Sequence, residues 1–301
     1  MTIAIQGLGK MGMQIAQKLI SDNHDVIAFD LNQVFLNEAS GFGAKSVSDK
    51  RQLVDSFGSN RVVIWMMIPS EYVASEIDDW LKILPERSII IDGGNSNFSD
   101  TGSNAKKLEE INCSMIDVGT SGGVHGLKNG FSMMVGANKK EDFETIEPIL
   151  ITLSKPEGDY KYFGRSGSGH YVKMIHNAIE YGMMESLAEG FNLLKNGPMK
   201  NINLADAATV WQHHSVITSW LNELCIDIFK NNPELADIDG YVAESGEARW
   251  TLQMAKDLSI DAPAIQSAFD VRLKSQQGEV NFTTKILAAM RNSFGGHKIN
   301  K

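Results

Sequence analysis

The sequence predicts an α/β fold, with an N-terminal doubly wound, Rossmann-type domain over residues 1–165 followed by an all-helical domain over residues 166–301. Three observations lead to this prediction. Short apolar runs typical of buried strands alternate with helical patterns in the first half, and a glycine-rich turn follows the first of these runs. Strand patterns disappear after residue 163. The boundary near residue 165 is placed by this change of pattern alone.

The N-terminal domain opens with a strand, a glycine-rich turn and a helix. Residues 2–6 predict a short buried strand and residues 13–20 predict a helix. The turn between them has the pattern G-x-G-x-x-G, formed by Gly7, Leu8, Gly9, Lys10, Met11 and Gly12. The first glycine allows a tight turn, the second lets a pyrophosphate approach the backbone, and the third lets helix and strand pack closely. This segment therefore predicts a dinucleotide site with the phosphates at the helix N-terminus.

Asp30 ends the second predicted strand, residues 25–30, and lies 18 residues beyond Gly12. A carboxylate at this spacing accepts hydrogen bonds from the adenosine ribose hydroxyls and repels a 2′-phosphate. The sequence therefore favours NAD as the cofactor, with NADP as the weaker alternative. The other interpretation is a surface carboxylate at a strand end.

Further strands are expected in alternation with helices, at residues 61–66, 88–92, 114–117, 131–135 and 160–163. Such βαβ alternation predicts a mainly parallel sheet, whose ligands bind beyond the carboxyl ends of the strands. Three strand-exit loops are then candidates for the site: Met67, Ile68 and Pro69, residues 93–96, and residues 119–123.

We expect Asn95 and Ser121 at the active site, with Asn95 and the 67–69 loop also near the cofactor. Gly122 and Gly123, which follow Ser121, leave backbone amides open to a carboxylate. Each glycine-rich loop taken alone is more often a simple turn.

The sequence of the second half has helical patterns throughout and predicts no strands. A long helix is predicted over residues 168–195, because Asn196-Gly197-Pro198 is a helix-ending sequence. Further helices are predicted near residues 203–230, 242–257, 262–276 and 282–294.

The long helix carries a polar face with unusual residues. At roughly 100° per residue, a sector of about 100° contains Lys173, His176, Asn177 and Glu180. A solvated surface is the common explanation for such a face. Asn and His are mediocre helix formers, however, and the small residues at 166–169 let a ligand approach the backbone. Its place at the domain junction, where ligands often bind, favours a functional role.

Composition narrows the class of protein. The formal net charge is −9 and no Lys/Arg cluster is present, so we expect no nucleic-acid partner, and an anionic substrate would need local cations. Cys113 and Cys225 lack metal-ligand spacing, which predicts a reducing compartment, no disulfide and no metal site. With no apolar run of about 20 residues and no signal-peptide pattern, we expect a cytoplasmic protein that does not enter a membrane.

Four separated motifs resemble those of decarboxylating 6-phosphogluconate dehydrogenases, in the same order and spacing. They lie at residues 7–12, 92–101, 119–123 and 170–181. The resemblance continues more thinly through residues 246–251, 269–272 and 291–297, and the length is similar to that of the short, NAD-preferring bacterial type within the β-hydroxyacid dehydrogenase superfamily.

This resemblance implies roles for individual residues. Lys173 matches the family's general base and Glu180 its general acid. The sugar acid is held by the matches Asn95, Ser121, Gly122, Gly123, His176 and Asn177, and its phosphate by Tyr181, Arg249, Thr251 and Arg272. Arg291 and His297 match a pair that the family donates across a dimer interface, which implies a homodimer or higher oligomer with shared sites.

The implied activity is oxidative decarboxylation of 6-phosphogluconate to ribulose 5-phosphate and CO2 with reduction of NAD, in pentose phosphate or gluconate metabolism. Another β-hydroxyacid dehydrogenase, such as one for 3-hydroxyisobutyrate, is an alternative, as is a non-catalytic NAD-binding protein. The chain departs from the family at Arg249, where lysine is usual, and at Val124 and His125, which replace an acidic pair. Asp30, Leu31 and Asn32 replace the Asn-Arg-Thr run of NADP-dependent members, which also favours NAD.

Overall fold

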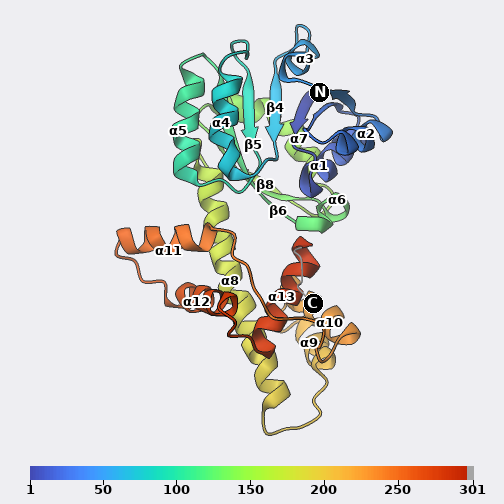
Figure 1. Cartoon of the computed structure of the whole chain (residues 1–301), viewed down its shortest axis with the longest axis vertical. Helices are drawn as coiled ribbons and strands as arrows, with labels where there is room; N and C mark the ends of the chain where they lie inside the picture. The colour runs from blue at the N-terminus through green and yellow to red at the C-terminus, as the bar shows by residue number, and fades with distance from the viewer. Residues whose placement is uncertain (297–301) are drawn as a thin grey trace. The chain divides into compact units, whose positions relative to one another are not determined.

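The computed structural model describes residues 1–296 and confirms the predicted fold class. The chain forms two compact units, Met1–Met174 and Ile175–Lys301. The first contains the sheet and its helices, and the second is helical (Figure 1). The long helix α8 (Ser168–Asn196) contributes residues to both units. The domain boundary expected near residue 165 stays a prediction.

The sheet of the first unit has eight strands in the order β3-β2-β1-β4-β5-β6-β7-β8. The first six in sequence are parallel; β7 runs antiparallel to β6, and β8 is parallel to β7. The strands are β1 (Thr2–Gln6), β2 (Asp25–Phe29), β3 (Lys45–Val47), β4 (Val63–Met66), β5 (Ile89–Asp92), β6 (Ser114–Ser121), β7 (Ser132–Ala137) and β8 (Tyr160–Tyr162).

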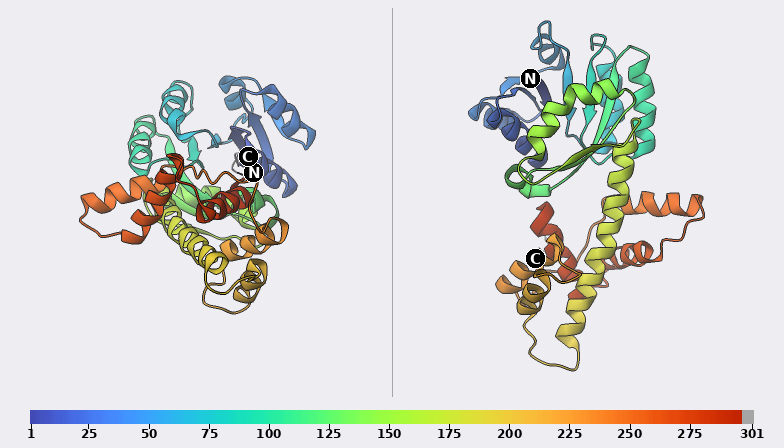
Figure 2. Two further views of the ribbon diagram at one scale, coloured as in Figure 1. Left: turned by 60° about the horizontal axis from the view of Figure 1, so that its bottom comes forward. Right: turned by 180° about the vertical axis from the view of Figure 1, so that it is seen from behind.

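Both faces of this sheet are apolar, because successive strand residues point to opposite sides. Ile3 and Ile5 pack with residues of α1 (Lys10–Ser21), α2 (Gln33–Gly41) and α7 (Lys140–Ser154). Ala4, between them, packs on the other side with residues of α3 (Lys50–Asp55), α4 (Ser70–Trp80) and α5 (Phe98–Glu109). Figures 1 and 2 show these two helical layers. The doubly wound arrangement follows from this two-sided burial.

In the second unit, helices lie on two sides of α8 (Figures 1 and 2). One apolar core joins α8 to α9 (Leu204–Gln212), α10 (Trp220–Asn231) and α13 (Phe282–Gly295). A smaller core joins α8 to α11 (Glu247–Asp257) and α12 (Pro263–Gln276). No helix within residues 1–296 is long and apolar enough to cross a membrane.

Three local predictions were wrong. The helix expected over residues 203–230 is two helices, because the Ser219 hydroxyl accepts from the Asn222 amide (3.1 Å) and caps a new start. The helix expected from residue 242 begins at Glu247, after Gly246 at φ 96°. Gly119, Thr120 and Ser121, expected in a loop, form the end of β6 opposite β7.

Candidate functional site

The glycine-rich turn is shaped by close backbone approaches in the first unit. Gly7 has φ +90°, and a Cβ there would lie 2.6 Å from the Met67 carbonyl oxygen. A Cβ on Gly12 would overlap the carbonyl oxygen of Gly7. Gly9 has open space where a Cβ would stand, at the N-terminus of α1. The structure therefore brings the turn and the 67–69 loop together and leaves the backbone at Gly9 open to a phosphate.

Asp30 connects the end of β2 to the same turn. Its Oδ2 accepts a hydrogen bond from the Leu8 amide (2.6 Å), and its Oδ1 accepts one from the Asn32 amide (2.7 Å). A carboxylate oxygen has a second lone pair, so both oxygens can still accept from ribose hydroxyls. Asp30 itself is partly exposed, and Leu31 beside it is 98% exposed.

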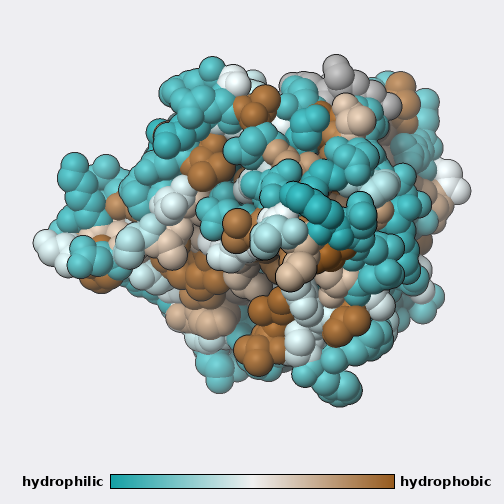
Figure 3. All heavy atoms as spheres, turned by 90° about the horizontal axis from the view of Figure 1, so that it is seen from below, coloured by the Kyte–Doolittle hydropathy of each residue, from teal (hydrophilic) through white to brown (hydrophobic). Residues whose placement is uncertain are grey.

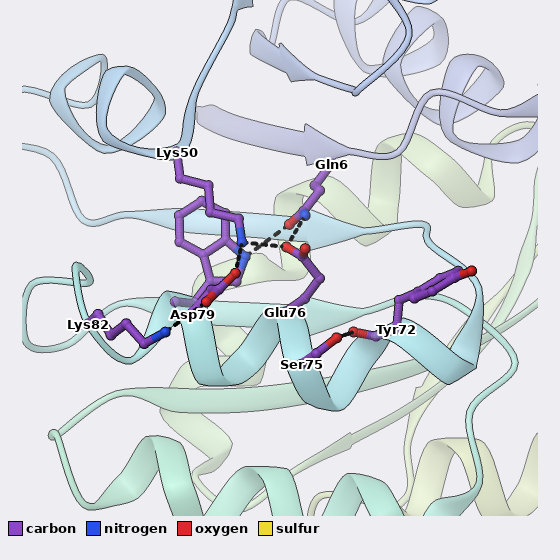
Figure 4. A network of polar contacts seen from close by, with 8 residues as sticks. Gln6, Lys50, Tyr72, Ser75, Glu76, Asp79 and Lys82 are labelled. Carbon is purple, nitrogen blue, oxygen red and sulfur yellow. Dashed lines mark hydrogen bonds and ion pairs between the residues drawn. The ribbon is translucent and has the colours of Figure 1, made fainter.

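A polar network that the sequence analysis did not identify fixes the residue before the turn. The Gln6 amide donates to Glu76 (2.6 Å) and accepts from the Trp80 indole nitrogen (2.9 Å). Lys50 pairs with Glu76 (2.8 Å) and with Asp79 (3.1 Å). Figure 4 shows this network beside the strands. The sequence feature that could have indicated this network is Gln6 itself, a polar residue that ends a mainly apolar strand directly before the glycine-rich turn.

The loop after β5 presents Asn95. Asp92 holds this loop, since its carboxylate accepts from the Gly94 amide (3.1 Å) and from the Ser96 hydroxyl (2.7 Å). Asn95 is exposed between these anchored residues. A Cβ on Gly93 would lie 2.7 Å from the sulfur of Met67, so this loop and the 67–69 loop are in contact.

The segment after β6 is held by α1, the helix that follows the glycine-rich turn. Ser121, Gly122 and Gly123 lead into the short helices η1 (Gly123–His125) and α6 (Gly126–Asn129). Gln14 accepts from the Leu127 amide (3.1 Å), and Lys18 donates to the Leu127 carbonyl (3.0 Å). Val124 and His125 form the end of η1 and are partly exposed.

Lys173 lies against β6 and is 7% exposed. A Cβ on Gly119 would overlap the Cβ of Lys173 and lie 2.9 Å from its Cγ, so only glycine fits there. Asp117, two residues earlier in β6, accepts from the amides of Gly167 (2.6 Å) and His170 (2.8 Å) at the start of α8. Asp117 therefore caps the helix that carries Lys173, and burial raises the pKa of its carboxyl. Nothing in the spacing of residues along the chain predicts the contact between Asp117 and the start of α8.

In the second unit, Tyr181 contacts a cationic and a polar residue beside its apolar neighbours. The guanidinium carbon of Arg272 is 3.2 Å from the centre of the Tyr181 ring, and the Tyr181 hydroxyl accepts from the Ser245 amide (3.2 Å). Arg272 is 1% exposed and Arg291 is 8% exposed. Burial lowers the pKa of Arg272 to about 10 and lowers that of Arg291, while Tyr181 and Glu180 raise both. Arg272 remains charged at neutral pH.

The remaining predicted residues have mixed surroundings. Arg249 is half exposed and donates to Glu244 (2.8 and 3.1 Å). The Thr251 hydroxyl is buried and donates to the Glu247 carbonyl (2.9 Å). His297 lies outside the described residues. Within the described part of the chain, no cluster of three His, Cys, Asp or Glu residues could hold a metal ion.

Comparisons with known proteins match both units. A family model described as the NAD binding domain of 6-phosphogluconate dehydrogenase matches residues 2–165, and one described as the 6-phosphogluconate dehydrogenase C-terminal domain matches residues 169–298. A Bacillus subtilis relative, provisionally named a 6-phosphogluconate dehydrogenase, is 36% identical over the full length of both chains.

A Haloferax volcanii relative is named an NAD(+)-dependent, decarboxylating 6-phosphogluconate dehydrogenase. It is 33% identical, over 99% of this chain and 98% of its own. Among solved structures, Plasmodium falciparum 6-phosphogluconate dehydrogenase has a TM-score of 0.83 at 24% identity, over 93% of this chain and 63% of its own. Mycobacterium tuberculosis 3-hydroxyisobutyrate dehydrogenase has a TM-score of 0.73 at 22% identity, over 95% and 98%. These two similarities describe the fold alone.

Proposed function

The chain belongs to the 6-phosphogluconate dehydrogenase family, and from this premise we propose that it converts 6-phosphogluconate and NAD to ribulose 5-phosphate, CO2 and NADH. The observation that best supports a phosphorylated substrate is the pair of buried guanidinium groups near Tyr181. Neither Arg272 nor Arg291 forms an ion pair with a carboxylate in the described residues, although both are buried. A buried cation without a directly paired anion is costly, and a phosphate ligand would relieve that cost.

The proposed reaction has three steps. When bound, NAD supplies the acceptor for the hydride that leaves C3. Lys173 takes the proton of the C3 hydroxyl as that hydride leaves, which gives a 3-keto acid. The resulting ammonium of Lys173 then polarises the ketone while the bond to the carboxylate breaks and CO2 departs. Glu180 protonates the carbon of the resulting enediolate to give ribulose 5-phosphate. The burial of Lys173 supports the first step, because desolvation favours the neutral amine.

NAD is the proposed cofactor, and the residues at the turn fit it. The open backbone at Gly9 suits the pyrophosphate, and the Asp30 carboxylate suits two ribose hydroxyls. The negative charge of Asp30 disfavours the 2′-phosphate of NADP. The name of the Haloferax relative as NAD(+)-dependent supports the same choice.

A homodimer with shared sites is also part of the proposal. The helical unit exposes large apolar residues, among them Leu193, Met199, Val210 and Val216, each at least 69% exposed. A space-filling view from below shows apolar groups among polar ones (Figure 3). Apolar surface of this kind supports association between copies of the chain.

The test is an assay of the purified protein with NAD and 6-phosphogluconate, followed at the NADH absorbance band and by CO2 release in equal amounts. We expect both signals together. In parallel, 3-hydroxyisobutyrate replaces the sugar acid, and a faster reaction with that substrate would reject the proposal.

Lys173→Met is the matched variant for this assay. It keeps an unbranched side chain that is one atom shorter and removes the amine, so we expect it to bind NAD as the unmodified protein does and to lose turnover by at least about a hundredfold. Cofactor binding is measured by protein fluorescence quenching. Near-normal turnover of this variant would remove Lys173 from the proposed base role.

A further inference from the structure

Glu247 forms a hydrogen-bonded chain with two residues of α8. The Nδ2 of Asn177 lies 2.7 Å from Oε1 of Glu247, and the Oδ1 of Asn177 lies 2.9 Å from Nδ1 of His176. Asn177 is 9% exposed and Glu247 is 2% exposed, so both residues are shielded from water. All three residues belong to the second unit.

The chemistry of these groups fixes the direction of the chain. A carboxylate has only acceptors, so the end of the Asn177 amide that faces Glu247 must be the NH2 group. The opposite end, the carbonyl oxygen, then faces His176. An amide oxygen cannot donate, so the Nδ1 atom of His176 must carry a hydrogen.

The distances from Nδ1 of His176 to Glu180 and to Asn177 differ. Oε2 of Glu180 is 4.0 Å from the same nitrogen, beyond hydrogen-bond distance, whereas the Asn177 oxygen is within it. The carbonyl of Asn177 therefore favours the neutral imidazole with its proton on Nδ1.

We propose that Glu247 is a positioning residue that, through the amide of Asn177, holds neutral His176 in the Nδ1–H tautomer. The Nε2 atom of His176 then carries the lone pair and accepts a hydrogen bond from a hydroxyl group. For a polyhydroxy acid, this would fix the orientation of one substrate hydroxyl; that consequence depends on the proposed function, while the tautomer itself does not.

The burial of Glu247 argues against a purely structural role. Its second oxygen, Oε2, is buried without a hydrogen-bond partner in the described residues, and burying a charge with incomplete partners is unfavourable. An apolar residue would fill the same place between α11 and α8 at lower cost. What an apolar residue could not do is dictate the orientation of the Asn177 amide.

The experiment is nitrogen-15 NMR of the imidazole rings in the full chain without substrate, at about pH 8, where an unperturbed imidazole is mostly neutral. His176 is assigned by the signal lost in His176→Gln. We expect His176 to be predominantly the Nδ1–H tautomer, which is the less common form of histidine in water. A predominantly Nε2–H ring in the unmodified protein overturns the proposal.

Glu247→Gln tests whether the carboxylate of Glu247 is what fixes the His176 tautomer. A carboxamide has the same shape but can present either its oxygen or its NH2 group, so Asn177 is released to flip and His176 should become a mixture of tautomers. Glu185→Gln, at another buried carboxyl on α8, is the matched control and should leave the His176 tautomer unchanged. An unchanged tautomer in Glu247→Gln also overturns the proposal, because a structural role would survive this isosteric change.

Two further measurements complete the test. Asn177→Ala removes the group that accepts from Nδ1, so His176 should return to the Nε2–H form. If Glu247→Gln does not fold, this variant replaces it in the test. In kinetics, Glu247→Gln should lower kcat/KM for 6-phosphogluconate by about tenfold with the KM for NAD unchanged. Absence of turnover in the unmodified protein, with the expected tautomers, would reject the proposed function and leave the positioning role standing.

Discussion

At the scale of single residues, Asp30 combines a structural contact with a charge that bears on cofactor choice. Its carboxylate binds the Leu8 and Asn32 amides, so removing the side chain would also disturb the glycine-rich turn. Asp30→Asn is the sharper change, because it removes the charge and keeps one acceptor oxygen, so only one of these two amide hydrogen bonds is lost. We expect the ratio of kcat/KM for NAD over that for NADP to fall by at least about tenfold.

The control for this prediction is Asp25→Asn, at the exposed start of the same strand. It should leave the cofactor ratio unchanged. A ratio for Asp30→Asn equal to that of the unmodified protein would mean that another feature selects the cofactor.

Glu185 is a residue whose ionisation opposes folding. Burial raises the pKa of its carboxyl to about 7, with a further increase from Glu189 and a decrease from Arg272. The folded state therefore holds the proton more tightly than the unfolded state, where the pKa is near 4.5. The resulting stability is fully present below about pH 4.5 and is lost as the pH rises through about 7.

Glu185→Gln should remove this loss. The gain in the free energy of unfolding is expected to grow from about 1 kcal/mol near pH 5 to about 3 kcal/mol near pH 8. Urea unfolding followed by circular dichroism at the two pH values measures it, with the exposed Glu223→Gln as control. A gain that does not increase with pH would show that Glu185 is not buried as a neutral acid.

At the scale of elements, the contact of β6 with α8 sets the position of Lys173. Gly119→Ala would place a methyl group within the side chain of Lys173, so the start of α8 or the lysine must shift. A displacement of about 1 Å can lower turnover by about a hundredfold, and we expect a loss of kcat of that size in Gly119→Ala. Steady-state kinetics measures it.

Gly182→Ala, farther along α8, is the matched control for this prediction. Its Cβ would meet nothing within 4 Å, so alanine should raise the free energy of unfolding by about 0.5–1 kcal/mol and leave turnover near normal. Equal kcat in both variants would contradict the idea that Gly119 positions Lys173.

At the scale of the whole molecule, local patterns predicted the fold well. The alternation of apolar strands and helices predicted the parallel sheet, and the long helix predicted over residues 168–195 is observed over Ser168–Asn196. The strand β3 has only three residues, too few to show a period, and was missed. The break before Ser219 was missed because no glycine or proline marks it; hydroxyl hydrogen bonds make the new cap.

The candidate residues were predictable only where local sequence carries their signal. Glycine spacing and the polar face of one helix are local patterns, and they made the turn and Lys173 candidates, whose roles stay predictions. Asp117, Glu247 and Gln6 act through partners 50 to 74 positions away in the chain. A single sequence contains no record of such pairings, so these residues appeared only in the structure.

The proposed sharing of sites between subunits can be tested by mixing two inactive variants. In the single chain, Tyr181 and Glu180 are among the groups that influence Arg291 on α13. Exchange of identical α13 segments between two copies would form the same contacts in trans, as in other exchanged dimers. In a mixed dimer, one chain carries Lys173→Met and the other carries Arg291→Ala. If the sites are shared, both changes lie in the same site, and the second site has neither change.

Co-expression of the two variants should then restore turnover to about a quarter of the unmodified level, because half of randomly paired dimers are mixed and one of their two sites carries neither change. Each variant alone should stay inactive, which excludes recovery by either chain. If Arg291 instead serves the site of its own chain, every site in the mixed dimer carries one change and no activity returns. The mixing experiment thus separates a site completed by the neighbouring subunit from one completed within a single chain.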